Sequence, residues 1–234
     1  MKIESKKYNR RFVIADIHGC KKTLEALIGS LKLLPNDALF FLGDYIDRGP
    51  DSIGVIDIIL DLQKHNFNIF TLRGNHEQDF LELSENYDQH FFMHYTKTIL
   101  KSENLIRKKG GIKKRVKKFI ENTQLYFELE DFYLVHAGFN FNNDDFLKDE
   151  TAILNLRGWK SDVKKTNGKK IIHGHQPTAH NKIIKAIQKD KPRIPLDNGC
   201  VYNKPHRYYD FNKLGQLCCL ELNSMELFCQ RNIE

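Results

Sequence analysis

The sequence lacks a long apolar run, and its cysteines follow no regular spacing. No stretch approaches the ~20 apolar residues that a membrane-crossing helix needs. Residues 1–11 are polar and basic, without the apolar core of a secretory signal. The five cysteines are odd in number and contain no Cys-x-x-Cys pair, which argues against a disulfide framework and favours a reducing compartment. We therefore expect a soluble, cytoplasmic protein with no membrane partner.

Internal repeats and low-complexity linkers are also missing, and the composition is not that of a disordered chain. The 234 residues include 16 Phe and 9 Tyr, and 41% are hydrophobic, which is enough for one packed domain. The formal net charge of +7 predicts attraction to anions, which include phosphorylated molecules and nucleic acid. Charge alone does not choose between these partners.

Three short apolar runs in the first third of the chain are typical of buried strands, at residues 12–15, 39–42 and 68–72. Apolar residues at helical spacing fill both gaps between them, over residues 20–33 and after Asp51, which we expect to be an N-cap. Strands that alternate with helices predict β-α-β units and a parallel sheet. The fold class is therefore α/β.

The rest of the chain is less regular. Residues 78–125 are polar and helix-prone and contain a basic run from Lys101 to Lys118. We expect a helical, basic insertion there, within a single domain that spans residues 1–234. Further strands are expected at residues 132–135, 170–172 and 194–196, and as a C-terminal hairpin of residues 217–222 and 225–229.

Glycine-containing motifs follow the predicted strands in order along the chain. They are residues 16–19 (Asp-Ile-His-Gly), residues 43–49 (Gly-Asp-Tyr-Ile-Asp-Arg-Gly), residues 74–77 (Gly-Asn-His-Glu), and a late pair at residues 136–138 (His-Ala-Gly) and 174–175 (Gly-His). Carboxylates, an amide oxygen and imidazoles bind divalent metals, and ligands of parallel sheets gather at the carboxyl ends of strands. Two ions about 3.5–4 Å apart could activate a water there and hold a phosphoryl group.

The spacing of individual residues refines this prediction. Asp16 and His18 are two apart, so extended backbone would point both side chains toward one ion. The two carboxylate oxygens of Asp44 could bridge that ion to a second. The remaining candidate ligands are Asn75, His136 and His175. Each residue alone has a simpler explanation as a cap, turn or core residue. Their common order at strand ends favours a metal-dependent phosphoesterase.

On these motifs the chain resembles the PPP group of calcineurin-like metallophosphoesterases, which includes serine/threonine protein phosphatases. It is most similar to the short bacterial and phage members of that group. The resemblance runs from about residue 11 to about residue 220. It implies a central β-sandwich of mixed sheets flanked by helices on both sides, a four-layer architecture.

The resemblance also implies the roles of individual residues. The first ion would be held by Asp16, His18 and Asp44, and the second by Asp44, Asn75, His136 and His175. A water between the two ions would attack phosphorus. His76 would be the general acid, oriented by Asp47, and Arg48 and Arg157 would bind the phosphoryl oxygens. Mn²⁺ is the expected metal, with Fe and Zn²⁺ as alternatives.

Two further residues near the motifs have structural explanations. We expect Arg73 to form a salt bridge with a loop carboxylate, and His173 to be a core residue or a neighbour of the ligands. Gln176 and Asn198 stand where the family usually has threonine, and Ala15 where it usually has glycine. These departures concern the loops and leave the ligands in place.

We expect a phosphomonoester hydrolase, a serine/threonine or dual-specificity protein phosphatase that acts on a phosphorylated protein or a small phosphate ester. Pro177 stands where nuclease-type relatives have a further histidine, which argues against nucleic acid as substrate. Asp47 and Glu77 favour monoesters over dinucleoside polyphosphates, whose hydrolysis is the alternative. A third class is a non-catalytic binding module that uses the basic run, although a solvated helix face explains that run more simply. The substrate and the oligomeric state stay open.

Overall fold

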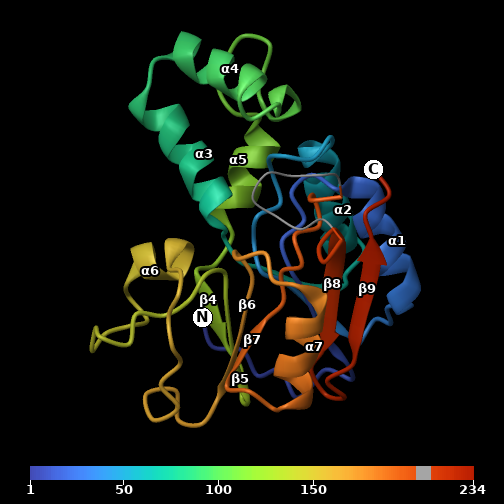
Figure 1. The fold of residues 1–234 in the computed structure, drawn as a ribbon. Helices are drawn as coiled ribbons and strands as arrows, with labels where there is room; N and C mark the ends of the chain where they lie inside the picture. Colours follow the sequence, from blue (N-terminus) through green and yellow to red (C-terminus); the bar gives the residue numbers. More distant parts are fainter. Residues whose placement is uncertain (204–211) are drawn as a thin grey trace.

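The computed structural model describes residues 1–203 and 212–234, which form two facing β-sheets with helices on the outer sides (Figure 1). The first sheet contains β1 (Arg11–Ile14), β2 (Ala38–Phe41), β3 (Asn68–Thr71), β8 (Gln216–Glu221) and β9 (Leu227–Arg231), in the order β3-β2-β1-β8-β9. The second contains β4 (Tyr126–Glu128), β5 (Phe132–Val135), β6 (Lys170–His173) and β7 (Arg193–Pro195), in chain order.

Both sheets are mixed. In the first, β1, β2 and β3 are parallel, while β8 and β9 join antiparallel. In the second, β4 is antiparallel to β5, and β5, β6 and β7 are parallel. The predicted mixed β-sandwich is confirmed, and so is the parallel order of the first three strands.

Seven α-helices lie in the described residues. They are α1 (Lys21–Leu31), α2 (Ser52–Lys64), α3 (Asn75–Asn86), α4 (Gln89–Thr98), α5 (Lys114–Glu121), α6 (Glu150–Asn155) and α7 (His180–Gln188), with a short 3₁₀ helix η1 (Glu103–Leu105). The N-cap predicted for α2 is confirmed, because the Asp51 carboxylate accepts from the Gly54 backbone N–H at 2.9 Å. None of the described helices is long and apolar enough to span a membrane.

The alternation of side chains along the strands divides the core into layers. Val13 and Phe40 from the first sheet meet Leu134 and Ile172 from the second between the sheets. The opposite face of the first sheet packs against α1 and α2. The outer face of the second sheet is covered by aromatic residues of the 139–159 segment and by Ile153 of α6. This is the expected four-layer arrangement of helix, sheet, sheet and helix.

The structure corrects the predicted C-terminal hairpin. Its second strand is β9, which begins at Leu227 and not at residue 225. The turn is longer because the Glu221 carboxylate accepts from the backbone N–H groups of Asn223 and Ser224, at 3.0 and 2.6 Å. Strand β4 and helices α6 and α7 were not predicted.

Helices α3, α4 and α5 stand at one end of the sandwich (Figure 1). The basic residues of α5 lie on its exposed face, whereas Val116 and Ile120 are buried. Part of that charge is paired, since Arg115 contacts Asp57 at 2.9 Å and Lys117 lies 3.9 Å from Glu85. We propose that residues 1–234 form one domain in which these helices are an insertion.

Candidate active site

The predicted site residues converge where strands of both sheets end. Asp16 follows β1, Asp44 follows β2, Asn75 and His76 begin α3 after β3, His136 follows β5, and His175 follows β6. The parallel strands β1–β3 and β5–β6 direct their carboxyl ends to this edge. The structure therefore brings together the six candidate ligands, which are separated by as many as 159 residues in sequence.

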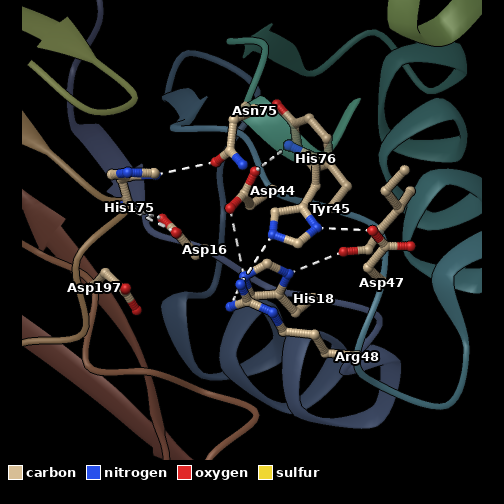
Figure 2. A network of polar contacts seen from close by, with 12 residues as sticks. Asp16, His18, Asp44, Tyr45, Asp47, Arg48, Asn75, His76, His175 and Asp197 are labelled. Carbon is tan, nitrogen blue, oxygen red and sulfur yellow. Dashed lines mark hydrogen bonds and ion pairs between the residues drawn. The ribbon is translucent and has the colours of Figure 1, made fainter. Parts of the chain in front are cut away.

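The carboxylate of Asp44 lies at the centre of the cluster (Figure 2). It is 2% exposed, and its two oxygens lie 3.5 Å from His18 Nε2 and 3.5 Å from His136 Nε2. Two sets of potential metal ligands share it: one with His18 and His76, the other with His136 and His175. A single buried carboxylate is thus placed to serve two ions.

Backbone carbonyls fix the tautomers of two histidines. His18 Nδ1 donates to the Ile46 carbonyl and His136 Nδ1 to the Leu42 carbonyl, each at 2.9 Å. The lone pair is therefore on Nε2, the nitrogen that faces Asp44 in both rings. Burial lowers the pKa of His18 to about 3 and also lowers that of His136. These shifts favour the neutral form of both rings, which is the form that binds a metal.

The contacts of Asn75 test whether the cluster suits a cation. Its Oδ1 lies 3.1 Å from His136 Nε2 and 3.0 Å from His175 Nδ1. His136 Nε2 and the amide oxygen are both acceptors, so they share no direct hydrogen bond, and His175 Nδ1 lies within reach of both, 3.2 Å from His136 Nε2. The other ring nitrogen of His175 is buried without a hydrogen-bond partner among the described residues. Acceptors that face one another in a buried space are stabilised by a cation placed between them.

Buried carboxylates point to the same conclusion. The backbone N–H of His175 donates to both oxygens of Asp16, at 2.9 and 3.1 Å. Burial and the charges of Asp197 and Asp44 raise the pKa of Asp16 well above its usual value. Asp197, which was not predicted as a site residue, has a pKa raised to about 7, mainly by burial. Asp197 comes shortly after β7, just as Asp16 comes shortly after β1. This position at the end of a strand is the feature by which the sequence could have identified Asp197 as a site residue.

The reason given for the pairing of Asp16 and His18 was wrong. His18 has a φ of 48°, so the backbone turns between them and is not extended. His18 instead faces Asp44, whereas the carboxylate of Asp16 contacts the His175 backbone. Asp16 and Asp197 lie on the His175 side of Asp44 in the view of Figure 2.

A histidine, a carboxylate and an arginine adjoin the ligand cluster. His76 Nδ1 donates to Asp47 Oδ2 at 2.7 Å, and Ser102 Oγ donates to the other carboxylate oxygen of Asp47 at 3.3 Å. Arg48 donates to His18 Nε2 at 2.9 Å and to His76 Nε2 at 3.0 Å. Burial alone would lower the pKa of His76, but the charge of Asp44 and the hydrogen bond to Asp47 raise it. Figure 2 shows the two rings and the guanidinium directed at one point.

Backbone strain is concentrated in these residues. A left-handed conformation, which costs non-glycine residues of order 1–3 kcal/mol, occurs at His18, Asp44, Asp47, Arg48 and His175. Surrounding contacts must therefore hold the loops in place.

Glu77 provides the main such contact for the loop after β2. Its carboxylate accepts from the backbone N–H groups of Asp44, Tyr45, Ile46 and Gly74, at 2.9–3.2 Å. Burial raises the pKa of Glu77 to about 8. The sequence motif indicates only a substrate class for Glu77, because the loop that it holds lies about thirty residues earlier in the chain.

Three other residues lie around the cluster. Arg157 is exposed after α6, and its charge contributes to lowering the pKa values of His136 and His175. Among the described residues Arg73 forms no salt bridge with a carboxylate, contrary to expectation. It donates to Thr123 Oγ1, Gln78 Oε1 and the Ile120 carbonyl, because polar groups of α3 and the end of α5 lie beside it. His173 is buried beside Trp159 and belongs to neither ligand set.

Comparison with known proteins adds family information. A profile of calcineurin-like phosphoesterases matches residues 10–213. The chain is 25% identical over 228 residues to the asymmetrical bis(5'-nucleosyl)-tetraphosphatase PrpE of Oceanobacillus iheyensis, covering 85% of this chain and 87% of that protein. It is 37% identical over 78 residues to serine/threonine-protein phosphatase 1 of Salmonella typhimurium, covering 33% and 34% of the two chains. The crystal structure of a putative diadenosine tetraphosphatase superposes with a TM-score of 0.71 at 18% identity, covering 99% of this chain and 97% of the other.

Close backbone approach makes Gly74 a test of this geometry. A Cβ at Gly74 would lie 2.1 Å from Asp44 Oδ1, so Gly74→Ala should displace the central carboxylate and reduce Mn²⁺ affinity measured by calorimetry. Gly29→Ala is the matched control, because a Cβ on that exposed residue of α1 meets nothing within 4 Å. The control should bind Mn²⁺ normally and gain roughly 0.5–1 kcal/mol of stability. Unchanged Mn²⁺ affinity in Gly74→Ala would contradict the packing described.

Proposed function

Because the chain belongs to the calcineurin-like phosphoesterase family and resembles its PPP group, we propose that it hydrolyses phosphomonoesters, with a phosphorylated protein as the substrate class. The reacting group would be phosphoserine or phosphothreonine, with phosphotyrosine as the alternative. The observation that carries this proposal is the hydrogen-bonded pair of His76 and Asp47, which lies beside two sets of potential metal ligands that have Asp44 in common. A metal centre and an acid–base pair at one buried edge are what phosphoester hydrolysis requires.

We propose that the cluster holds two divalent ions. Asp16, His18 and Asp44 would bind one, and Asp44, Asn75, His136 and His175 the other. The facing acceptors of Asn75 and His136 and the neutral rings support this assignment. Two such ions would lower the pKa of water and neutralise charge on the phosphoryl group. Mn²⁺ is the metal we propose, and Fe or Zn²⁺ would also suit oxygen and imidazole ligands.

His76 is the proposed general acid. Its Nδ1–H is held by Asp47, so Nε2 is the nitrogen that faces the cluster and can carry the transferred proton. Ser102, before η1, helps to hold Asp47, so the helical segment contributes to orienting the acid. Arg48 donates to Nε2 in this structure. A phosphoryl group that takes up the donors of Arg48 would release Nε2 to hold a proton for the leaving oxygen.

Arg48 and Arg157 are the proposed phosphoryl-binding residues. The guanidinium of Arg48 presents two nitrogens between His18 and His76, which suits two phosphoryl oxygens. Arg157 makes no hydrogen bond to the cluster among the described residues, but its exposed side chain and its electrostatic effect on His136 and His175 support a contact with bound substrate.

A specific observation favours dinucleoside polyphosphates as a second candidate substrate class. A cavity of about 680 Å³ adjoins residues 176–178, directly after His175. Its cationic lining consists of Lys160, Lys182, Lys185, Lys191 and Arg193, and no carboxylate is among the described lining residues. Such a cavity suits the distal phosphates of a longer anion. The PrpE likeness over most of the chain points to the same class.

The metal assignment predicts the effect of Asp44→Asn. The amide removes the charge shared by the two ligand sets, so Mn²⁺ affinity should fall by about 10²-fold or more, since loss of a residue that only orients a ligand costs roughly 10–100-fold. Calorimetric titration measures this directly, and Asp61→Asn on the exposed face of α2 is the control.

Chelation should also abolish hydrolysis of an aryl phosphate, and Mn²⁺ should restore it. Full activity in metal-free protein would rule out the proposed centre, and no turnover with any metal would favour a binding module.

The role of His76 predicts a dependence on the leaving group. His76→Asn should reduce kcat by roughly 10²–10⁴-fold for an alkyl phosphate, the usual range for a general acid. Nitrophenyl phosphate should lose much less, because its leaving group needs little protonation. His65→Asn, on the exposed end of α2, should leave both rates unchanged. Equal losses on the two substrates would mean that His76 does not act as the acid.

A substrate comparison separates the two candidate classes. We expect kcat/KM for a phosphopeptide to exceed that for a dinucleoside tetraphosphate. Lys182→Ala/Lys185→Ala, in the basic cavity, should raise KM for the dinucleotide by roughly 2–30-fold, because each exposed charge contributes about 0.2–1 kcal/mol. The phosphopeptide should be unaffected, and Lys114→Ala/Lys118→Ala on α5 is the charge-matched control. A dinucleotide preferred by a wide margin, and dependent on Lys182 and Lys185, would establish the second candidate instead.

A further inference from the structure

A second group of metal-binding side chains lies outside the proposed centre. Cys218 on β8 and Cys229 on β9 are directly opposite each other, and His180 is the first residue of α7. We call these three residues the thiol–imidazole cluster. Their ligand atoms all lie within 4.8 Å of one another. None of the three belongs to the ligand sets around Asp44, which contain no sulfur.

The distances in the cluster suit a tetrahedral ion. The two Sγ atoms are 3.2 Å apart, and Cys229 Sγ is 3.8 Å from His180 Nδ1. Sulfur atoms placed ~2.3 Å from a tetrahedral Zn²⁺ lie roughly 3.8 Å apart, and a sulfur and an imidazole nitrogen roughly 3.5 Å apart, so the two Sγ atoms would separate by about half an ångström when the ion binds. Both cysteines are free thiols. Small side-chain movements would therefore close the three residues around one ion.

The chemistry of the cluster selects a soft cation. Thiols and an imidazole suit Zn²⁺ and similar ions and disfavour Mg²⁺, Ca²⁺ and Mn²⁺. A hydrogen bond with Cys218 lowers the pKa of Cys229, whereas the same hydrogen bond and burial raise the pKa of Cys218. Cys229 and His180 are only partly buried, which leaves a path from solvent. The thiols would release their protons to solvent when the ion binds.

We propose that the thiol–imidazole cluster binds one soft divalent cation of the Zn²⁺ class, with water as the fourth ligand. The ion would join the start of α7 to the β8–β9 hairpin. His180 is five residues after His175, so the ion would also restrain the segment that leads out of the proposed active site. This inference does not depend on the proposed function, because it concerns separate residues and a different class of metal.

Cobalt spectroscopy tests the proposal in the full chain saturated with Mn²⁺. One equivalent of Co²⁺ should produce the near-ultraviolet charge-transfer absorption of a thiolate–cobalt bond. Because the ligand sets around Asp44 contain no sulfur, Co²⁺ that replaces Mn²⁺ there cannot give this band. Cys229→Ser should abolish the band, and His180→Ala should weaken Co²⁺ binding. Cys219→Ser is the matched control, because Cys219 is the neighbouring strand residue and belongs to the opposite core layer.

A second measurement uses the free energy of binding. Because Zn²⁺ can also occupy the ligand sets around Asp44, the comparison is made between variants: Zn²⁺ should raise the Tm of the parent and of Cys219→Ser by more than that of Cys229→Ser. If Cys229→Ser fails to fold, His180→Ala decides, because its half-buried side chain can be removed with little loss of packing. Absence of the charge-transfer band in the parent would overturn the proposal. So would persistence of the band in Cys229→Ser, or air oxidation of the pair to a disulfide in the presence of excess Zn²⁺.

Discussion

The burial of carboxylates and neutral imidazoles at one point is the constraint on which the candidate site depends. Asp16, Asp44 and Asp197 are each at most 3% exposed, and burial lowers the pKa values of the nearby His18 and His136 rings, which disfavours a compensating positive charge on them. Buried charges are costly unless they are paired or coordinate metals. Arg48 provides one positive charge at the edge of the cluster. Two divalent ions would supply the rest, which is why we assign the cluster to a dinuclear centre.

That constraint explains the architecture around it. The ligands come from both sheets, so their separation is set by how the sheets pack on the core between them. Left-handed backbone at Asp44 and His175 aims these side chains inward, at a cost in strain. The Glu77 carboxylate offsets part of that strain by holding the loop after β2 through its N–H groups. The site is thus maintained by the β-sandwich and by the first turn of α3.

Local patterns in the sequence predicted the parts of the structure that depend on local order. The alternation of β1, α1, β2, α2 and β3 was foreseen because apolar spacing distinguishes strands from helices. Strands β5, β6 and β7 were also predicted from apolar runs, but their assembly into a second sheet was expected only through the family resemblance. Strand β4 and helix α6 were missed because they have three and six residues, too few for a periodic signal.

Contacts across long sequence separations were not foreseen. The motifs predicted which side chains would meet, but not the left-handed backbone at His18. The pairing of Cys218 and Cys229 with His180 depends on how the elements pack and carries no local pattern. The burial of Asp197 also depends on packing, although its position just after β7 was a local signal. Arg73 was correctly expected to be structural, but its partners are neutral groups contributed by the end of α5.

The most direct test of the dinuclear assignment is anomalous diffraction from crystals of the protein soaked in Mn²⁺. Two manganese peaks, one on each side of the Asp44 carboxylate, are expected; a single peak, or manganese bound away from Asp44, would contradict it.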